Sequence, residues 1–168
     1  MIVLGVDPGV NATGYGVVAQ TSGGAVSLLE CGVVRTAANA SLAARLRTIF
    51  EGVQDVLSRH PADVVAVEGV FYGRNVRSTV ILGHARASVL LAAAVRDLEV
   101  AEYSPAQIKS AVAGTGRATK EQVQYMVQQH LRLRTAPTPA DAADGAAVAL
   151  CHALRGSLDR RLADAAGA

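Results

Sequence analysis

The stretch that most constrains the fold is residues 2–18, IVLGVDPGVNATGYGVV. A run of apolar, β-favouring residues delivers one carboxylate, Asp7, and then breaks at Pro8-Gly9. A second apolar run follows the Gly14-Tyr15-Gly16 segment, which we interpret as a turn. This pattern predicts a buried strand, a tight loop and a paired strand, with Asp7 at the carboxyl end of the first strand. Because an unpaired buried anion costs several kcal/mol, Asp7 is expected to have a compensating partner.

Length and composition favour one compact domain. A chain of 168 residues can bury roughly 70% of its unfolded surface. We predict a single domain over residues 1–155 and a flexible tail over 156–168, because the tail has no sustained pattern. No apolar run reaches the roughly 20 residues of a membrane span, and no signal peptide is expected. Cys31 and Cys151 lie outside any metal-binding spacing, so we expect buried thiols and a cytoplasmic location.

The next segments predict an antiparallel meander followed by a crossover. Ala25 to Arg35 favours a third strand after a short turn. The apolar period then changes from Ser41 to His60, which predicts an amphipathic helix with Ser41 as N-cap, stopped by Pro61. Asp63 to Val67 is a short β-branched run. Because it follows a crossover helix, it is expected to lie parallel to the first strand.

The second half of the sequence predicts four helices around one more strand. The expected elements are a long apolar helix from Val76 to Leu98, a strand from Val100 to Tyr103, and helices over 105–113, 119–131 and 138–155. Ser104-Pro105 is a typical helix start. Together the elements predict an α/β fold, a five-stranded mixed sheet with helices on both faces.

Four acids occupy positions from which they could converge. Glu68 ends its apolar strand much as Asp7 does, and Asp141 and Asp144 share one face of the last helix. Stabilisation of the helix dipole alone would account for Asp141, but not for Asp7 or Glu68. Converging carboxylates need a compensating charge, which a divalent ion with oxygen ligands supplies. Acid-lined two-metal sites support in-line phosphoryl displacement, so phosphodiester hydrolysis is the predicted chemistry.

Four sequence blocks carry a family resemblance over Met1 to about Leu154: GVDPGVNATGYGV, AVEGVF, QIKSAVAGTGRATKEQVQ and PADAADGAA. In this order they resemble the RuvC family of Holliday junction resolvases, endonucleases of the ribonuclease H-like fold. The resemblance implies a catalytic site with Mg²⁺ or Mn²⁺, two ions per site, held by Asp7, Glu68, Asp141 and Asp144. It also implies a homodimer that nicks four-way junction DNA symmetrically in recombination and repair, leaving 5′-phosphate and 3′-hydroxyl ends. The RuvA-RuvB branch-migration complex is the implied partner.

The resemblance further implies DNA-binding residues. Phe71 would stack on bases at the opened junction, where an aromatic face is worth roughly 1–3 kcal/mol per base. Lys109 and Lys120 would contact DNA. They are the only lysines in the chain, whose net charge of +2 does not by itself indicate nucleic acid. Core packing for Phe71 and simple solvation for the lysines are the alternatives. Weaker candidates for phosphate contacts are Arg74, Arg77 and Arg117.

Other functions fit the sequence less well. An aspartate before a glycine-rich hairpin also occurs in actin-like and sugar-kinase ATPases, but these need two such domains. A non-catalytic junction-binding module would not need four acids. A related nuclease acting on an RNA–DNA hybrid or a transposon end remains an alternative substrate assignment. The four histidines form no ligand motif; His84 and His152 have no predicted role, although His152 lies two turns beyond Asp144.

Overall fold

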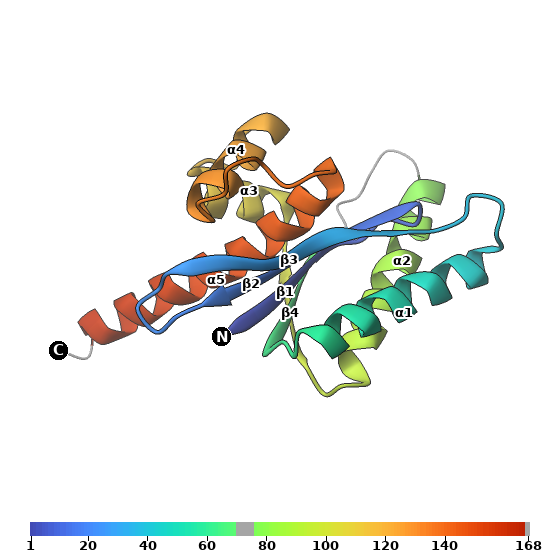
Figure 1. The fold of residues 1–168 in the computed structure, drawn as a ribbon, viewed down its shortest axis with the longest axis horizontal. Helices are drawn as coiled ribbons and strands as arrows, with labels where there is room; N and C mark the ends of the chain where they lie inside the picture. Colours follow the sequence, from blue (N-terminus) through green and yellow to red (C-terminus); the bar gives the residue numbers. More distant parts are fainter. Residues whose placement is uncertain (70–75, 167–168) are drawn as a thin grey trace.

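The computed structural model describes residues 1–69 and 76–166, with side chains described up to residue 156. A five-stranded sheet has helices on both faces (Figure 1). The elements in chain order are β1 (Ile2–Asp7), β2 (Ala12–Gln20), β3 (Val26–Arg35), α1 (Leu42–Arg59), β4 (Val64–Glu68), α2 (Val76–Ala94), β5 (Glu99–Tyr103), α3 (Pro105–Ala113), α4 (Lys120–His130) and α5 (Ala140–Ala166).

The sheet is mixed, with strand order β3-β2-β1-β4-β5. The first three strands form the expected antiparallel meander, and β1 pairs parallel with β4, as β4 does with β5. Val6 is level with Val67 in the β1–β4 register. Continuing this register by one residue brings Asp7 beside Glu68. The predicted α/β class and the parallel crossover are therefore confirmed.

Side-chain alternation divides the interior into two cores. Leu4 and Val6 of β1 pack with α1 and α2, whereas Val3 packs on the opposite face with α3, α4 and α5. On β4, Val64 and Ala66 belong to the α5 side. Because strand side chains alternate with period two, Asp7 and Glu68 also project toward the α5 side. The alternation therefore directs both acids to the same layer.

Local capping explains where three helices begin. Ser41 accepts a hydrogen bond from the Ala44 backbone N–H at the start of α1. Ser104 and Thr119 form capping boxes at the starts of α3 and α4, which satisfy backbone donors that a helix leaves unpaired. Gly114 ends α3 in the left-handed region, with φ of 76°. These starts and this stop confirm the sequence predictions.

Two helix ends differ from the predictions. Helix α2 ends at Ala94 rather than Leu98 because Asp97 adopts a left-handed conformation, with φ of 54°, and the Leu98 N–H donates to the Ala93 carbonyl. Helix α5 continues to Ala166 instead of ending near Arg155. Residues 157–166 contain mostly good helix formers and no proline, so no local signal stops the helix. The flexibility predicted for 156–168 stays a prediction.

The predicted Gly14-Tyr15-Gly16 turn is wrong, because these residues lie inside β2. The chain reverses instead between the end of β1 and Ala12. The buried Thr13 hydroxyl donates to the Gly9 carbonyl at 2.8 Å and so holds this loop closed. Glycine accompanies close packing as well as turns, and at Gly14 and Gly16 it permits the close packing of α5 described below.

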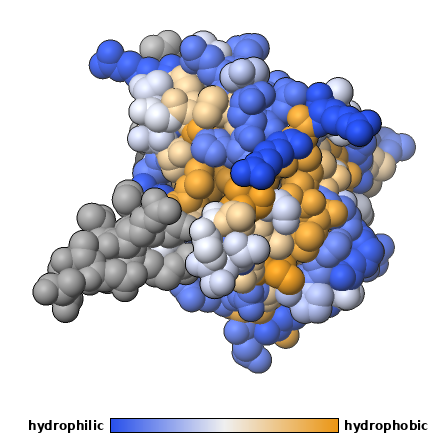
Figure 2. Space-filling view, turned by 60° about the vertical axis from the view of Figure 1, so that its left-hand side comes forward, coloured by the Kyte–Doolittle hydropathy of each residue, from blue (hydrophilic) through white to orange (hydrophobic). Residues whose placement is uncertain are grey.

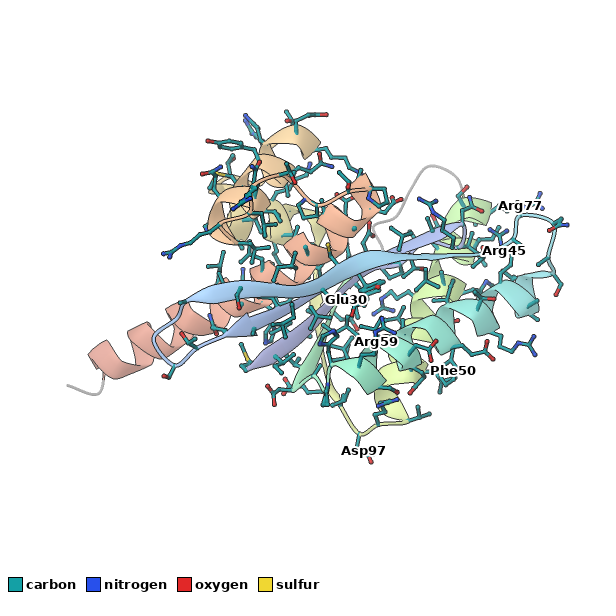
Figure 3. The ribbon with its side chains drawn as sticks, in the orientation of Figure 1. Glu30, Arg45, Phe50, Arg59, Arg77 and Asp97 are labelled. Carbon is teal, nitrogen blue, oxygen red and sulfur yellow. The ribbon has the colours of Figure 1, made fainter. Side chains whose placement is uncertain are left out.

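An ionic cluster attaches the edge strand β3 to the end of α1. Glu30 accepts a hydrogen bond from Arg59 Nη2 at 2.6 Å, and Figure 3 shows these two residues near each other. Glu30 also accepts a hydrogen bond from the Tyr15 hydroxyl at 2.8 Å, and its carboxylate lies 2.7 Å from His60 Nε2. The Arg59 hydrogen bond contributes most to lowering the Glu30 pKa, to about 2. This cluster lies on the α1 face of the sheet, whereas Asp7 and Glu68 project from the opposite, α5 face.

The surface is mostly polar with apolar areas between. Figure 2 shows a band of apolar residues across one face, bordered by hydrophilic ones. No helix in the described part of the chain has both the length and the apolarity that a membrane crossing requires.

Candidate active site

Two buried strands deliver the first two acids. Asp7 is the last residue of β1 and Glu68 the last residue of β4, and the two strands are parallel neighbours. Ligands of open α/β sheets bind at such carboxyl ends. Both side chains are partly buried and project toward the α5 face of the sheet.

A glycine-lined contact brings α5 down onto this edge. Gly14 is the cross-strand partner of Asp7, and a β-carbon on Gly14 would lie 1.9 Å from the Asp141 carbonyl oxygen. A β-carbon on Gly16 would lie 2.4 Å from Ala146 Cα, and one on Gly5 would lie 2.1 Å from the Ala149 nitrogen. Only strands without side chains at these positions let the helix backbone approach so closely. The first turns of α5 therefore lie beside Asp7.

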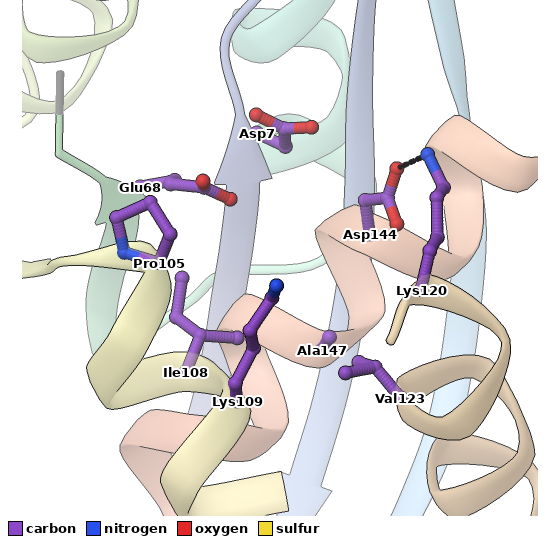
Figure 4. Close-up of a pocket in the computed structure, with 9 residues that line it drawn as sticks. All are labelled: Asp7, Glu68, Pro105, Ile108, Lys109, Lys120, Val123, Asp144 and Ala147. Carbon is purple, nitrogen blue, oxygen red and sulfur yellow. Dashed lines mark hydrogen bonds and ion pairs between the residues drawn. The ribbon is translucent and has the colours of Figure 1, made fainter. Parts of the chain in front are cut away.

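Three of the four predicted acids line one cavity of about 300 Å³, together with both lysines. Asp7, Glu68 and Asp144 surround it, while Lys109 from α3 and Lys120 from α4 extend toward them (Figure 4). Its apolar wall consists of Pro105, Ile108, Val123 and Ala147. A cavity with acids on one side and ammonium groups on the other suits a cation and an anion together.

Burial and neighbouring carboxylates raise the pKa of Asp7 and of Glu68. The pKa of Asp7 is raised to about 6, mainly by burial and next by the Asp144 carboxylate, with the Lys120 charge opposing. Burial also raises the pKa of Glu68 to about 7, followed by the charges of Asp7 and Asp144, with Lys109 and Lys120 opposing. Such shifts mark a place where negative charge is insufficiently compensated. An added cation would be bound favourably here.

One compensating charge is already present. Lys120 Nζ lies 2.6 Å from Asp144 Oδ2. This hydrogen bond contributes most to raising the pKa of Lys120 above its ordinary value. The ammonium therefore remains charged at neutral pH and neutralises one acid of the site.

The fourth acid, Asp141, lies outside this cavity. It sits half-buried in the first turn of α5, and its charge raises the pKa of Asp7, so it belongs to the same electrostatic cluster. Among the side chains of residues 1–69 and 76–156, no three acids, histidines or cysteines are already arranged to hold a metal ion. Binding by all four acids stays a prediction, and it requires side-chain rotation.

The predicted DNA contacts are placed only in part. Phe71 and Arg74 lie outside the described residues. Arg77 is exposed at the start of α2, and Arg117 is exposed between α3 and α4. Their DNA contacts stay predictions.

The two histidines left without a predicted role lie on α2 and α5. His84 is exposed on α2. His152 Nδ1 lies 2.8 Å from the Tyr103 hydroxyl and so links α5 to the end of β5. Neither histidine lines the cavity of the acids.

The sequence reasoning missed the apolar wall and a second hollow. The smaller hollow lies on the other side of Asp7 and Glu68, bounded by Pro8, Gly69 and Leu82 of α2. No motif singles out Leu82. The close-packed glycines do have a sequence signal. Gly14 and Gly16 are two residues apart in a strand-like run, so they lie on the same face of the strand, although the segment was interpreted as a turn.

The strand order and the acids at the ends of β1 and β4 define the class as ribonuclease H-like. The family model described as "Crossover junction endodeoxyribonuclease RuvC" matches residues 3–152. The chain belongs to this RuvC family of endonucleases.

Relatives and solved structures agree over nearly the whole chain. The RuvC of Pelotomaculum thermopropionicum is 44% identical over 96% of this chain and 98% of its own length. That of Frankia alni is 49% identical over 100% of this chain and 85% of its own. The structure titled "T. thermophilus RuvC in complex with Holliday junction substrate" is 38% identical, with a TM-score of 0.89 over 95% of this chain and 96% of that one. The yeast mitochondrial resolvase Ydc2, at 15% identity and a TM-score of 0.65, supports the fold alone.

Proposed function

We propose that this endonuclease resolves Holliday junctions by nicking two symmetric strands, in recombination and DNA repair. The observation that carries the proposal is the cavity in which Asp7, Glu68 and Asp144 face Lys109 and Lys120. Membership of the RuvC family and the similarity to a RuvC bound to a Holliday junction support the choice of substrate.

The donor set fits hard divalent cations. Carboxylate oxygens are the ligands that Mg²⁺ and Mn²⁺ favour. Burial and neighbouring carboxylates raise the pKa of Asp7 and of Glu68, and a bound cation would offset both effects. Asp7, Glu68 and Asp144 would hold the ions, with Asp141 joining after rotation of its side chain. When bound, two such ions would activate the attacking water and stabilise the leaving oxygen of a phosphodiester.

The chain's own residues position the substrate. Lys109 and Lys120 extend from two different helices, so they can hold phosphates of the bound strand beside the acids. The wall formed by Ile108 and Val123 limits water on this side. Phe71, Arg74, Arg77 and Arg117 would extend the contacts, with Phe71 stacking on a base at the opened junction.

We also propose that the chain works as a homodimer through α2. Apolar side chains are exposed at Val76 (76%), Val80 (52%) and Leu91 (56%) of this helix, and at Val95 (58%), the residue after its end. Spacings near four and eleven residues place them on one helix face. Next to it, Leu46 and Phe50 of α1 line a groove with Leu91. A second copy that covers this face would present two active sites to the two strands to be cut.

The remaining assignments follow the family. The RuvA-RuvB branch-migration complex is the proposed partner at the junction. A cytoplasmic location agrees with the two cysteines, which are free thiols, Cys151 buried and Cys31 half-buried.

A cleavage assay with matched substrates tests the proposed function. The full chain is incubated with Mg²⁺ and a labelled four-way junction, a duplex of the same sequence or an RNA–DNA hybrid, with EDTA as the metal-free control. We expect paired symmetric nicks in the junction alone, and products that a ligase reseals. Preferential cutting of the hybrid would transfer the activity to the rival substrate, and ATP turnover without strand cutting would reject a nuclease.

A further inference from the structure

We infer that Lys120 is the resident cation of the metal-free site and competes with a divalent ion for Asp144. A DNA phosphate that draws the ammonium away would then tighten metal binding. The identity of the metal rests on the proposed function, whereas the competition itself requires no DNA cleavage.

Lys120 contacts Asp144 directly, and the lysine side chain is free to move away from the carboxylate. Lys120 Nζ lies 2.6 Å from Asp144 Oδ2, with the lysine side chain 52% exposed and the aspartate 20% exposed. The ammonium is carried on a flexible four-carbon stem, so it can exchange one anionic partner for another without backbone movement. The more buried carboxylate stays in place, because it is fixed on α5 beside the sheet.

The position of Lys120 is not explained by helix stability. It is the first residue of α4, whose start is already satisfied by the capping box of Thr119 and Gln122. A positive charge in the first turn is unfavourable, because the helix dipole is positive at this end. The compensating interaction for the ammonium is therefore Asp144, together with the nearby charges of Asp141 and Asp7.

Lys109 provides an internal comparison. It lines the same cavity and its charge acts on Glu68. Among the described residues, however, the ion pair at the acids involves Lys120 and not Lys109. Figure 4 shows Lys109 pointing into the space between the acids, whereas Lys120 contacts Asp144. Competition for a ligand oxygen is therefore specific to Lys120, whereas general repulsion of cations would involve both lysines.

Competition has a thermodynamic consequence. A metal ion that takes the Asp144 oxygen must displace the ammonium, and whatever displaces the ammonium favours the metal by the same factor. The backbone of DNA supplies phosphates that bind lysine. The metal site would thus assemble most tightly when the substrate is present, and the empty protein would hold metal weakly.

Calorimetric titration of Mn²⁺ into the DNA-free full chain tests the competition. Lys120→Gln is expected to bind Mn²⁺ about fivefold tighter than the unmodified protein, the factor that corresponds to the upper range of an exposed ion pair. Lys120→Arg, which keeps a cation, should bind as the unmodified protein does. Lys109→Gln is the matched control, and its gain in Mn²⁺ affinity should be less than half that of Lys120→Gln. Equal gains for both lysine variants, or none for Lys120→Gln, would overturn the inference.

Two further measurements complete the test. Thermal unfolding in EDTA checks that each variant is folded. If Lys120→Gln is not folded, Lys120→Ala takes its place, with the same expected outcomes. Junction affinity with and without Ca²⁺ then measures the coupling. The unmodified protein should gain more affinity from Ca²⁺ than Lys120→Gln does, and equal gains would reject the coupling. If Mn²⁺ binding follows these expectations but the unmodified protein does not nick junctions, the proposed function is rejected and the competition still holds.

Discussion

Gly14, the cross-strand partner of Asp7, lies directly against the backbone of Asp141: a β-carbon on Gly14 would come 1.9 Å from the Asp141 carbonyl oxygen. This contact joins β2, the strand paired with the one that carries Asp7, to the helix turn that carries Asp141 and Asp144. The distance between Asp7 and the acids of α5 therefore depends on the absence of a side chain at Gly14 of β2.

Gly14→Ala is expected to push α5 away from the sheet. Overpacking of this kind costs about 1–3 kcal/mol, and cleavage should fall further because Asp144 moves away from Asp7. Gly23→Ala is the control, since a β-carbon there meets only Thr21 Oγ1 at 3.9 Å. Thermal unfolding and junction cleavage are measured on both. A fully active Gly14→Ala protein would contradict the role of this contact.

Asp7→Asn should retain junction binding and lose cleavage by more than about a hundredfold, because even an outer-shell partner of a metal ligand is worth 10–100-fold. The change removes a charge and leaves the DNA surface intact. Gel-shift and cleavage assays measure the two properties separately. Asp97→Asn is the matched control, at an exposed left-handed position at the end of α2. Near-normal cutting by Asp7→Asn would show that Asp7 has been misassigned.

The raised carboxyl pKa values predict a pH-dependent stability in EDTA. The pKa of Asp7 is raised from 3.8 to about 6, mainly by burial, so the folded chain holds a proton that the unfolded chain has lost. The resulting stabilisation is present below pH 4 and is lost as pH rises through about 6. Glu68 acts in the same direction, with a pKa of about 7.

Unfolding free energies at pH 5 and pH 8 test this sign. Between these values the unmodified protein should lose about 1–2 kcal/mol more than Asp7→Asn does. Mg²⁺ should stabilise the protein more at pH 8, where both acids are ionised. A pH dependence identical in the two proteins would show that Asp7 does not titrate in this range.

Leu91→Glu should weaken a dimer formed through α2, because it places a charge on the apolar face. The expected result is a shift to monomer in sedimentation, with loss of paired nicks and normal folding. Leu29→Glu on β3 is the control, since Leu29 is 45% exposed on a different element. Dimerisation that is equally strong in Leu91→Glu would exclude this face.

Phe71→Ala should impair cleavage of an intact junction more than cleavage of one loosened by central mismatches. A stacking side chain helps to hold unpaired bases, and a mismatched centre needs less of this help. Cleavage rates on the two junctions are compared within each protein. Equal losses on both would contradict base stacking.

Local signals determined much of the fold and half of the site. Apolar runs that end in Asp7 and Glu68, a change of period after Ser41, and capping residues at Ser104 and Thr119 act within a few residues of where they stand. For this reason the strands, most helix ends and the parallel β1–β4 pair follow from sequence. The prediction of a turn at Gly14 failed because a glycine signals a bend and a close approach equally well.

Only the tertiary structure decided how the acids and lysines meet. Asp144 lines the cavity and Asp141 does not, although both lie on one helix face, because the contact of α5 with β2 sets the angle of its first turns. The Lys120–Asp144 pair joins residues 24 positions apart on different helices, and no local pattern encodes it. The sequence by itself determined which chemistry the residues can carry. The packing of α5 against the glycine positions of β1 and β2 decided which charged side chains share a site.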